Sequence, residues 1–412
     1  MEFLPRSLGT RPRLACEVRA EGVVAARAED AFALLSAVSR VPLADEVVIP
    51  RLRAVDANGE VDNSSAPSGV GGDAAGRAAV VAAVRKALEA VALRSREVTL
   101  IVPDAAARVL LLDFDELPAK QAEALPVVRF RLKKLLPFDA DDAAVSYQVM
   151  ASVKGSLQVL AVAMPRELLA DYENVVREAG FEPGAILPST LAALAGLPEG
   201  DAPLLVVNAG REGVTTAIVK AGVLLLHRTV DLGADLRADA QADRQAEQRV
   251  ASQLLDAAAA QLAGNALQEQ LVDQERSSAL PARPEPAGFD GQNDAAAAIE
   301  TTALAHEIEA EIAQEVAAES SLLETAGEVA QAVSVAAAYF EDTLQTPPAA
   351  VHSAGTLGAT ALSALLDQEH IGPLAVREIV RSEMLGAGAS SAGSPGGVPL
   401  GWLAGVRGAL AN

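Results

Sequence analysis

The chain has 412 residues, half of them hydrophobic, which is enough for two or more domains with well-packed cores. Its formal net charge of -22 argues against a nucleic-acid-binding surface, because phosphate recognition needs clustered lysines and arginines. With a single cysteine, Cys16, the chain can form no internal disulfide and no cysteine-based metal site. The four histidines show no metal-ligand spacing, so we expect no metal centre built on them.

We expect neither a secretory signal nor a transmembrane helix. Residues 1–18 lack a long apolar core of the signal-peptide type. No window approaches the roughly 18 uncharged apolar residues that a membrane-spanning helix needs. The sequence therefore predicts a cytoplasmic protein, in which any membrane association comes through a partner or a short amphipathic element.

The first hundred residues predict a small sheet and a helix. Two apolar runs on either side of Ala20-Glu21 are typical of a β-hairpin, and Ala33–Val38 continues as a third strand. A polar, glycine-rich loop over Ala54–Asp73 leads to a helix over Ala74–Leu93, which Asp73 can cap.

A cationic amphipathic helix is predicted over Ala119–Leu136, in two pieces because Pro126 lies inside it. Phe130, Leu132 and Leu135 are expected to face inward. The basic residues between them are expected to remain solvated, which is commoner than a phosphate or lipid site.

This helix belongs to a predicted compact unit over 104–187, which follows a buried strand at 98–102. A strand pair alternates about a tight turn at Lys154-Gly155. A second helix then ends at Gly180, and a further strand returns to the first sheet. The unit is expected to contain a helix, two strands, a helix and a strand.

The second half predicts three strands over 204–227 and then helical periodicity over 231–270 and 298–344. The segment 275–293 is rich in Pro, Gly and Ser, and we expect a disordered or loosely held insertion there.

The last part of the chain predicts a strand at 349–352, a glycine turn and a helix over 359–366. A flexible loop over 386–397 then precedes a short helix at 401–410. That helix is expected to pack under the second domain, because about ten residues anchor poorly in a membrane.

Three glycine-containing turns follow buried strands, at 16–22 (CEVRAEG), 208–216 (NAGREGVTT) and 352–358 (HSAGTLG). A nucleotide site built on such turns uses backbone N–H groups to cradle phosphates and acidic side chains to hold hydrated Mg²⁺. Each turn alone is weak evidence, because a glycine turn after a strand is usually only a turn.

In this order, with the inserted unit between the first and second turns, the chain resembles the actin-like ATPase superfamily. Within it, the chain is similar to the PilM family of type IV pilus assembly proteins, which is akin to FtsA. The resemblance covers most of the chain except 54–73 and 275–293. It is carried by KKLLPFDADDAAVSYQV at 133–149, REAGFEPGAILPSTLAAL at 177–194, VVNAGREGVTTAIVKAGVLLLHRTV at 206–230, AVSVAAAYFEDTL at 332–344 and WLAGVRGAL at 402–410.

The resemblance implies an actin-like two-lobed α/β fold, made of duplicated RNase H-like domains with a small α/β subdomain inserted in the first lobe. The first lobe is expected over 1–103, and the subdomain with the return to that lobe over 104–190. The second lobe is expected over 191–386, and a loop and terminal helix that pack on the lobes over 387–412.

The resemblance also implies which residues would contact a nucleotide, and every turn departs from the family pattern. Glu17 stands where the family has an aspartate, and Arg19 stands where it has a glycine, whose positive φ a Cβ disfavours. Asn208 replaces an aspartate and is a poorer partner for a hard cation, and Ala354-Gly355 replace a glycine pair. The implied contacts are Glu17, Arg19, Asn208, Gly210, Thr215, Thr216, Ser353, Gly355 and Thr356.

These departures predict no catalytic residue and no efficient hydrolysis, although ATP or ADP with Mg²⁺ stays a candidate ligand. The resemblance implies a scaffold of type IV pilus biogenesis and twitching motility, cytoplasmic and peripheral to the inner membrane. In the family, the inserted subdomain and the first domain form a groove for the N-terminal peptide of the membrane protein PilN. Expected partners are therefore a PilN-like tail and the inner-membrane platform, with self-association left open.

Two alternatives remain at this point. One is an active ATPase or sugar-kinase-like enzyme on the same fold, and the other is an FtsA-like filament protein that touches the membrane directly. The type II secretion proteins of the GspL kind are related, but they carry a transmembrane helix, which we do not expect in this sequence.

Overall fold

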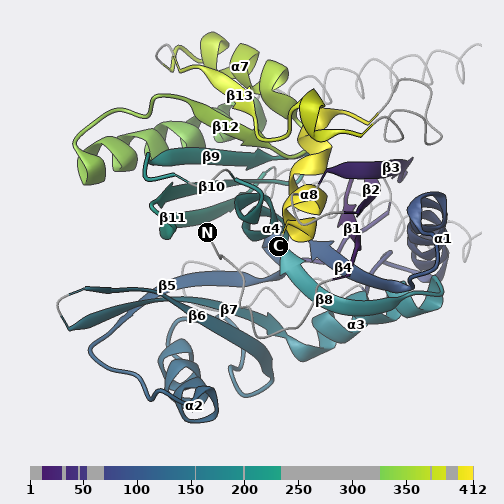
Figure 1. Ribbon diagram of the computed structural model, residues 1–412, viewed down its shortest axis with the longest axis horizontal. Helices are drawn as coiled ribbons and strands as arrows, with labels where there is room; N and C mark the ends of the chain where they lie inside the picture. Colours follow the sequence, from purple (N-terminus) through teal and green to yellow (C-terminus); the bar gives the residue numbers. More distant parts are fainter. Residues whose placement is uncertain are drawn as a thin grey trace, which may run out of the picture. The chain divides into compact units, whose positions relative to one another are not determined.

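The computed structural model describes residues 12–29, 34–44, 47–52, 69–153, 155–197, 200–232, 325–371, 374–386 and 398–411. The elements below belong to one compact unit, drawn in colour in Figure 1. The predicted insertion at 275–293, and nearly all of the predicted helix over 231–270, lie outside the described residues, as do most of the glycine-rich loop and the loop after 386.

Two five-stranded sheets share one topology (Figure 1). The first has the order β3 (Leu35–Pro42), β2 (Gly22–Ala28), β1 (Leu14–Arg19), β4 (Glu97–Val102), β8 (Glu182–Pro188). The second has the order β11 (Val223–Asp231), β10 (Gly213–Lys220), β9 (Leu204–Ala209), β12 (Val351–Ala354), β13 (Val376–Glu378). In each sheet the first three strands pair with one another in antiparallel fashion, and the last two are parallel to the central strand.

Two sheets with the same order and the same strand directions are what a duplicated domain produces. The predicted two-lobed actin-like α/β fold is therefore confirmed, although β13 was not predicted. We call the half with the first sheet lobe I and the half with the second sheet lobe II.

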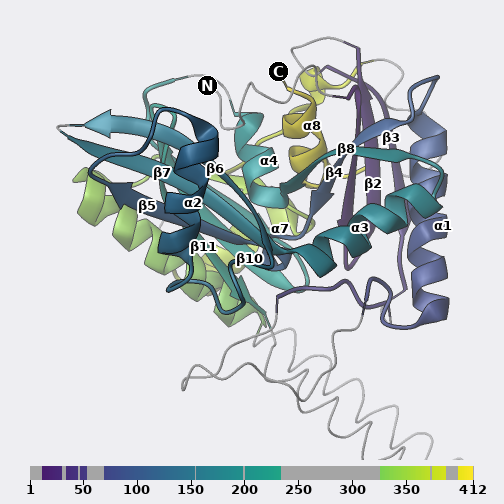
Figure 2. The same cartoon turned by 90° about the horizontal axis from the view of Figure 1, so that it is seen from below.

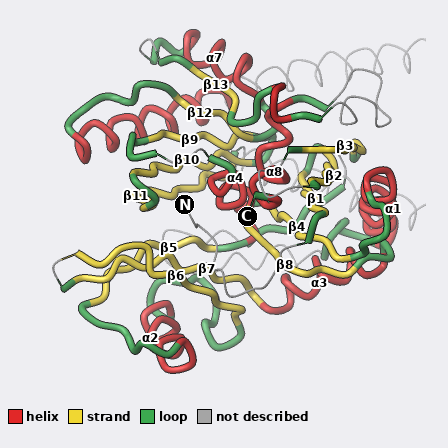
Figure 3. The backbone as a smooth tube through the Cα atoms, in the orientation of Figure 1, coloured by secondary structure: helices red, strands yellow, loops and turns green. Residues whose placement is uncertain are grey.

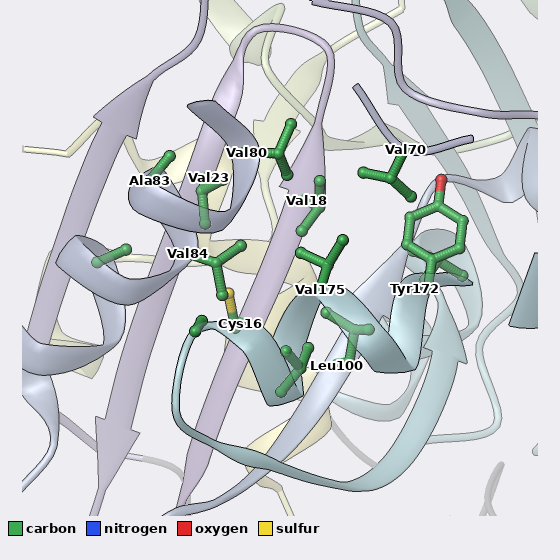
Figure 4. Packing of buried hydrophobic residues seen from close by; sticks show 14 of the residues in the cluster. Cys16, Val18, Val23, Val70, Val80, Ala83, Val84, Leu100, Tyr172 and Val175 are labelled. Carbon is green, nitrogen blue, oxygen red and sulfur yellow. The ribbon is translucent and has the colours of Figure 1, made fainter. Parts of the chain in front are cut away.

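Side chains of β1 alternate between two environments, as in any strand with two covered faces. Cys16 and Val18 enter an aliphatic core beneath α1 (Ala74–Val91) and α3 (Arg166–Glu178), as Figure 4 shows. Burial, and secondarily the Glu17 carboxylate, raise the pKa of the Cys16 thiol, so this cysteine is a protonated core residue. Glu17 must therefore point to the opposite face of the sheet.

The helix α1 begins as the sequence predicted. Oδ1 of Asp73 accepts a hydrogen bond of 2.7 Å from the backbone N–H of Gly76, which is N-cap geometry. Val80, Val84 and Leu88 recur every four residues and are fully buried on the sheet.

Tyr172 of α3 is fully buried in the core that Figure 4 shows. Its hydroxyl donates a 2.7 Å hydrogen bond to the carbonyl oxygen of Pro50. We expect Tyr172→Phe to lower the free energy of unfolding by about 1–2 kcal/mol, because it leaves a buried carbonyl unsatisfied. Urea denaturation measures this loss. The matched control is Tyr339→Phe, whose ring is 43% exposed, and an equal loss in both variants would contradict the assignment.

A third sheet forms the inserted subdomain (Figure 3). It has the order β5 (Arg108–Phe114), β7 (Ser156–Pro165), β6 (Ala143–Val153), and α2 (Gln121–Leu132) covers one face. The sequence predicted two strands here, and β5 is the strand it missed. The opposite face of the sheet packs on lobe II, since Leu160 shares a core with Val219 and Leu224.

Three expectations for the predicted helix over 119–136, which the structure confines to α2, were wrong. It is one helix that contains Pro126. Phe130 and Leu135 are 69% and 48% exposed, whereas Leu132 is buried as predicted. The side chains that face inward are Ala124, Val128 and Leu132. Phe130 is two residues from both Val128 and Leu132, so at 100° per residue it lies about 200° around the helix from each of them.

The C-terminal segment, η4 (Leu400–Leu403) and α8 (Ala404–Leu410), is buried between the sheets. Figure 2 shows α8 beside α4 (Ser189–Ala195), and α8 also contacts β1, β2 and β4. The terminal helix therefore packs on lobe I, not under lobe II as predicted. The helix over 325–344 and α7 (Gly358–Gln368) instead cover the outer face of the second sheet. Within the described residues, no helix combines the length and apolarity that a bilayer crossing requires.

Candidate functional site

The candidate site lies where parallel strands of both sheets end. The carboxyl ends of β1, β4 and β8 place Arg19, Asp104 and Ser189 at one edge of lobe I. The ends of β9 and β12 bring Asn208 and Thr356 to the facing edge of lobe II. Carboxyl ends of parallel strands are the usual location of ligand sites in α/β folds. Four of these five side chains, all but Thr356, are closely hydrogen-bonded to one another.

The first turn differs from the expectation. Arg19 is the last residue of β1, paired with Gly22, and has no positive φ, so the predicted strain at its Cβ was wrong. The two-residue turn consists of Ala20 and Glu21. The side chain of Arg19 is therefore free of backbone conflict and extends into the space between the lobes.

Glu17 is fully buried and forms a charged pair with Arg19. Nη2 of Arg19 lies 2.6 Å from Oε1 of Glu17 and donates to Oγ of Ser189 at 2.7 Å. The Ser189 hydroxyl in turn donates to Oε1 of Glu17 at 2.6 Å. Burial raises the pKa of Glu17 above its usual value, and the Arg19 cation and the Ser189 hydroxyl oppose that rise. The carboxylate is thus already neutralised inside the chain.

Asn208 connects this pair to a second buried carboxylate. Its Oδ1 accepts from both terminal nitrogens of Arg19 at 3.3 Å. Its Nδ2 donates to Oγ of Ser189 at 2.9 Å, Oγ1 of Thr190 at 2.9 Å and Oδ2 of Asp104 at 3.2 Å. An amide can accept from a cation and donate to a carboxylate at once, whereas an aspartate could only accept. An asparagine therefore suits this position better than an aspartate would.

A second bridge uses Glu21 from the hairpin turn of lobe I. Its Oε1 accepts a 2.6 Å hydrogen bond from the backbone N–H of Arg211 and a further one from the Thr356 hydroxyl. Burial acts to raise the pKa of Glu21, but these two hydrogen bonds and the Arg19 charge outweigh it, so the pKa lies below its usual value. The carboxylate is therefore bound as an anion between two turns of lobe II.

Of the predicted contacts on β10 and β12, Thr215 faces the cleft, whereas Thr216 and Ser353 face the opposite side of the sheet. Thr215 lines the cleft and shares a 3.0 Å hydrogen bond with Thr229. Thr216 is the next residue of β10 and must face the opposite side, toward the core of Val214 and Ile218. Ser353 likewise lies on the same face of β12 as a residue of that outer core. Both expectations were wrong because side chains alternate along a strand.

The glycine requirement of the third turn is met. Gly355 has a φ of +92°, and a Cβ there would lie 2.4 Å from the carbonyl oxygen of Ala209 and 2.5 Å from Oδ1 of Asn208. Only glycine fits this approach. Gly210 also makes a close approach, because a Cβ there would lie 2.9 Å from Oε1 of Glu21.

Sequence reasoning missed Glu21, Asp104, Ser189, Thr190 and Arg211. A signal was present for three of them. Asp104 follows β4 after a single proline, and Ser189-Thr190 follow β8 directly, so each stands at the end of a strand parallel to β1. Glu21 gave no such signal, because a charged residue in a hairpin turn is usually solvated.

The residues present do not fit a bound Mg²⁺-nucleotide. The backbone N–H groups of Gly210, Arg211, Gly355 and Leu357, which the predicted turns would offer to phosphates, all donate to acceptors within the chain. Both oxygens of Asp104 accept hydrogen bonds within the chain, and Oε1 of Glu17 is paired with Arg19. Oε2 of Glu17 has no hydrogen-bond partner, but it lies against Gly405 of α8, and Glu17 is not among the residues that line the cleft. No group of three or more metal-ligating side chains gathers anywhere in the part of the chain that the structure describes.

Comparisons with known proteins give a likeness of structure only. No protein-family model matches the chain, and no curated protein gives a significant match. Among solved structures, a chain of the "PilM-PilN type IV pilus biogenesis complex" has a TM-score of 0.55 at 17% identity, covering 91% of this chain and 90% of that one. The cytoplasmic domain of EpsL, an inner-membrane component of the type II secretion system of Vibrio cholerae, has a TM-score of 0.32 at 14% identity, covering 53% and 70%.

At nine-tenths coverage of each chain, the first likeness must extend over both lobes. It agrees with the duplicated sheet topology, which was established without it. The chain therefore has the actin-like, two-lobed fold of that pilus biogenesis structure.

Proposed function

We propose that this chain is a scaffold of a type IV pilus assembly platform and binds the N-terminal tail of a PilN-like inner-membrane protein. The observation that carries the proposal is the structural likeness to a chain of the PilM-PilN complex over 91% of this chain, at a TM-score of 0.55. The name of that complex includes PilN, which is the type of partner proposed for this chain. In this role the protein lies at the inner face of the membrane, held there by the partner.

The inserted subdomain offers a surface suited to an extended peptide. In the order β5-β7-β6, both β5 and β6 are edge strands among the described residues. An edge strand presents unpaired backbone N–H and carbonyl groups, to which a peptide can add as a further strand. The subdomain is also fixed to lobe II through Leu160, so a peptide in a groove between it and lobe I would meet a rigid surface.

The charges of the cleft favour a binding role over catalysis. Glu17 occupies the position of the family's metal-facing acid, and its Oε1 is paired with Arg19 at 2.6 Å. Its unpartnered Oε2 lies against Gly405 of α8, so neither oxygen faces the cleft to position a hydrated Mg²⁺. This favours the scaffold over the ATPase or kinase alternative.

The test is a binding titration with a synthetic peptide of the N-terminal tail of the PilN-like protein from the same genome. We expect a Kd below about 100 μM, which corresponds to about -5.5 kcal/mol. Fluorescence anisotropy of the labelled peptide measures it, with a scrambled peptide as the control. Equal binding of both peptides, or no binding of either, would refute the proposed partner.

A further inference from the structure

The cleft between the lobes carries its own cation and its own anion. Arg19 and Glu21 are two residues apart at the end of β1 and in the turn that follows. Arg19 is 9% exposed and reaches Asn208 of lobe II. Glu21 reaches two groups of lobe II, the Arg211 amide and the Thr356 hydroxyl. One short segment thus supplies both charges that join the facing edges.

The groups that bind the Glu21 carboxylate are those that bind a phosphate elsewhere. A backbone N–H on a glycine turn and a threonine hydroxyl on the next turn are typical oxyanion donors. The bare backbone of Gly210 makes room for the carboxylate, because a Cβ there would lie 2.9 Å from its Oε1 and 3.0 Å from Oγ1 of Thr356. The two turns therefore form a small oxyanion site that this chain fills with its own side chain.

Two further backbone N–H groups of the turns also donate within the chain. The N–H of Gly210 donates to the carbonyl of Gly213 at 3.0 Å, and that of Gly355 donates to the carbonyl of Gly401 at 3.0 Å. Gly401 belongs to η4, so the buried C-terminal segment completes the closure of the third turn. A nucleotide would have to displace these hydrogen bonds as well as the Glu21 carboxylate.

We propose that Arg19 and Glu21 are a built-in replacement for a metal–nucleotide ligand, which joins the two lobes through intramolecular bonds. Several hydrogen bonds join the lobes. Arg19 donates to Asn208, and the Arg211 backbone N–H and the Thr356 hydroxyl donate to Glu21. The Arg211 guanidinium donates to the carbonyl oxygen of Ala20 at 3.1 Å. The lobes are then held at one angle without nucleotide. This property is independent of which partner the scaffold binds.

The test compares Glu21→Ala with Glu212→Ala. Both remove one negative charge from the cleft lining, and Glu212 is the residue beside Arg211 on the same turn. We expect Glu21→Ala to lower the Tm by about 2–4 °C more than Glu212→Ala does. Inorganic phosphate should then raise the Tm of Glu21→Ala more than that of the wild type or Glu212→Ala, with sodium chloride at equal ionic strength as the blank.

A second measurement uses the wild-type chain and does not depend on how well any variant folds. Mg²⁺-ATP and Mg²⁺-ADP at about 5 mM should leave its Tm unchanged, because the cleft is already occupied by the Arg19 and Glu21 side chains. A nucleotide that did bind the folded state would raise the Tm. A nucleotide-dependent rise in the wild-type Tm would overturn the proposal. Equal phosphate effects on all three proteins would also overturn it, since they would show that no oxyanion site was vacated.

Discussion

Replacing Arg19 with methionine should lower the free energy of unfolding by about 3–5 kcal/mol, because it leaves the Glu17 carboxylate buried without its cation. Methionine keeps much of the side-chain volume, so the loss reports the charge and hydrogen bonds rather than a cavity. Three groups lose a partner at once: Glu17, Ser189 and Asn208. Urea denaturation followed by circular dichroism measures the change.

The stability loss in Arg19→Met should depend on pH. Burial already raises the pKa of Glu17, and removal of Arg19 raises it further. A carboxyl whose pKa is higher in the folded state stabilises the fold below its unfolded pKa and loses that contribution as the pH rises through the folded pKa. The deficit of Arg19→Met relative to wild type should therefore be larger at about pH 7 than at about pH 4.

The double variant Glu17→Gln/Arg19→Met is the control, because it removes both charges of the pair. It should recover a large part of the loss, since a buried pair is replaced by neutral groups. A double variant that is as unstable as the sum of the two single variants would show that Glu17 and Arg19 do not interact.

Gly408→Ala should cost at least about 3 kcal/mol, because the added methyl group meets backbone and not a movable side chain. A Cβ at Gly408 would lie 1.9 Å from the carbonyl oxygen of Ala192 and 2.9 Å from the nitrogen of Gly196. These atoms belong to α4 and its C-terminal end, so α8 would have to move away from lobe I. The same urea titration measures the loss.

The matched control for this variant is Gly327→Ala in the helix over 325–344, where a Cβ would meet nothing within 4 Å. Alanine is the better helix former, so we expect a gain of up to about 1 kcal/mol there. A wild-type stability of Gly408→Ala would contradict the observed contact between α8 and α4.

The C-terminal segment contacts the candidate site at two further glycines. A Cβ at Gly405 would lie 2.4 Å from Oε2 of Glu17, and a Cβ at Gly401 would lie 2.4 Å from the carbonyl oxygen of Gly355. The segment therefore contacts the charged pair of lobe I and the third turn of lobe II through bare backbone. Loosening it in Gly408→Ala should also weaken the closure of the cleft.

The sequence alone determined the elements whose signals are local. The β1–β2 hairpin, the capping of α1 by Asp73 and the positive φ of Gly180 follow from two apolar runs about a short turn and from single-residue preferences. These features depend on neighbours along the chain, so the sequence displays them directly. The two-lobed fold was predicted from the resemblance to the actin-like superfamily, which the three turns and the five quoted segments carry.

The tertiary structure alone decided which charges meet in the cleft. Arg19 and Asn208 are 189 residues apart, and Thr356 and Glu21 are 335 residues apart, so no spacing in the sequence predicts either contact. The direction of Phe130 was also undetermined, because α2 offers two apolar stripes and only the sheet beneath selects one. Parallel strands bring distant chain segments to one edge, and the chemistry of that edge exists only once both sheets have formed.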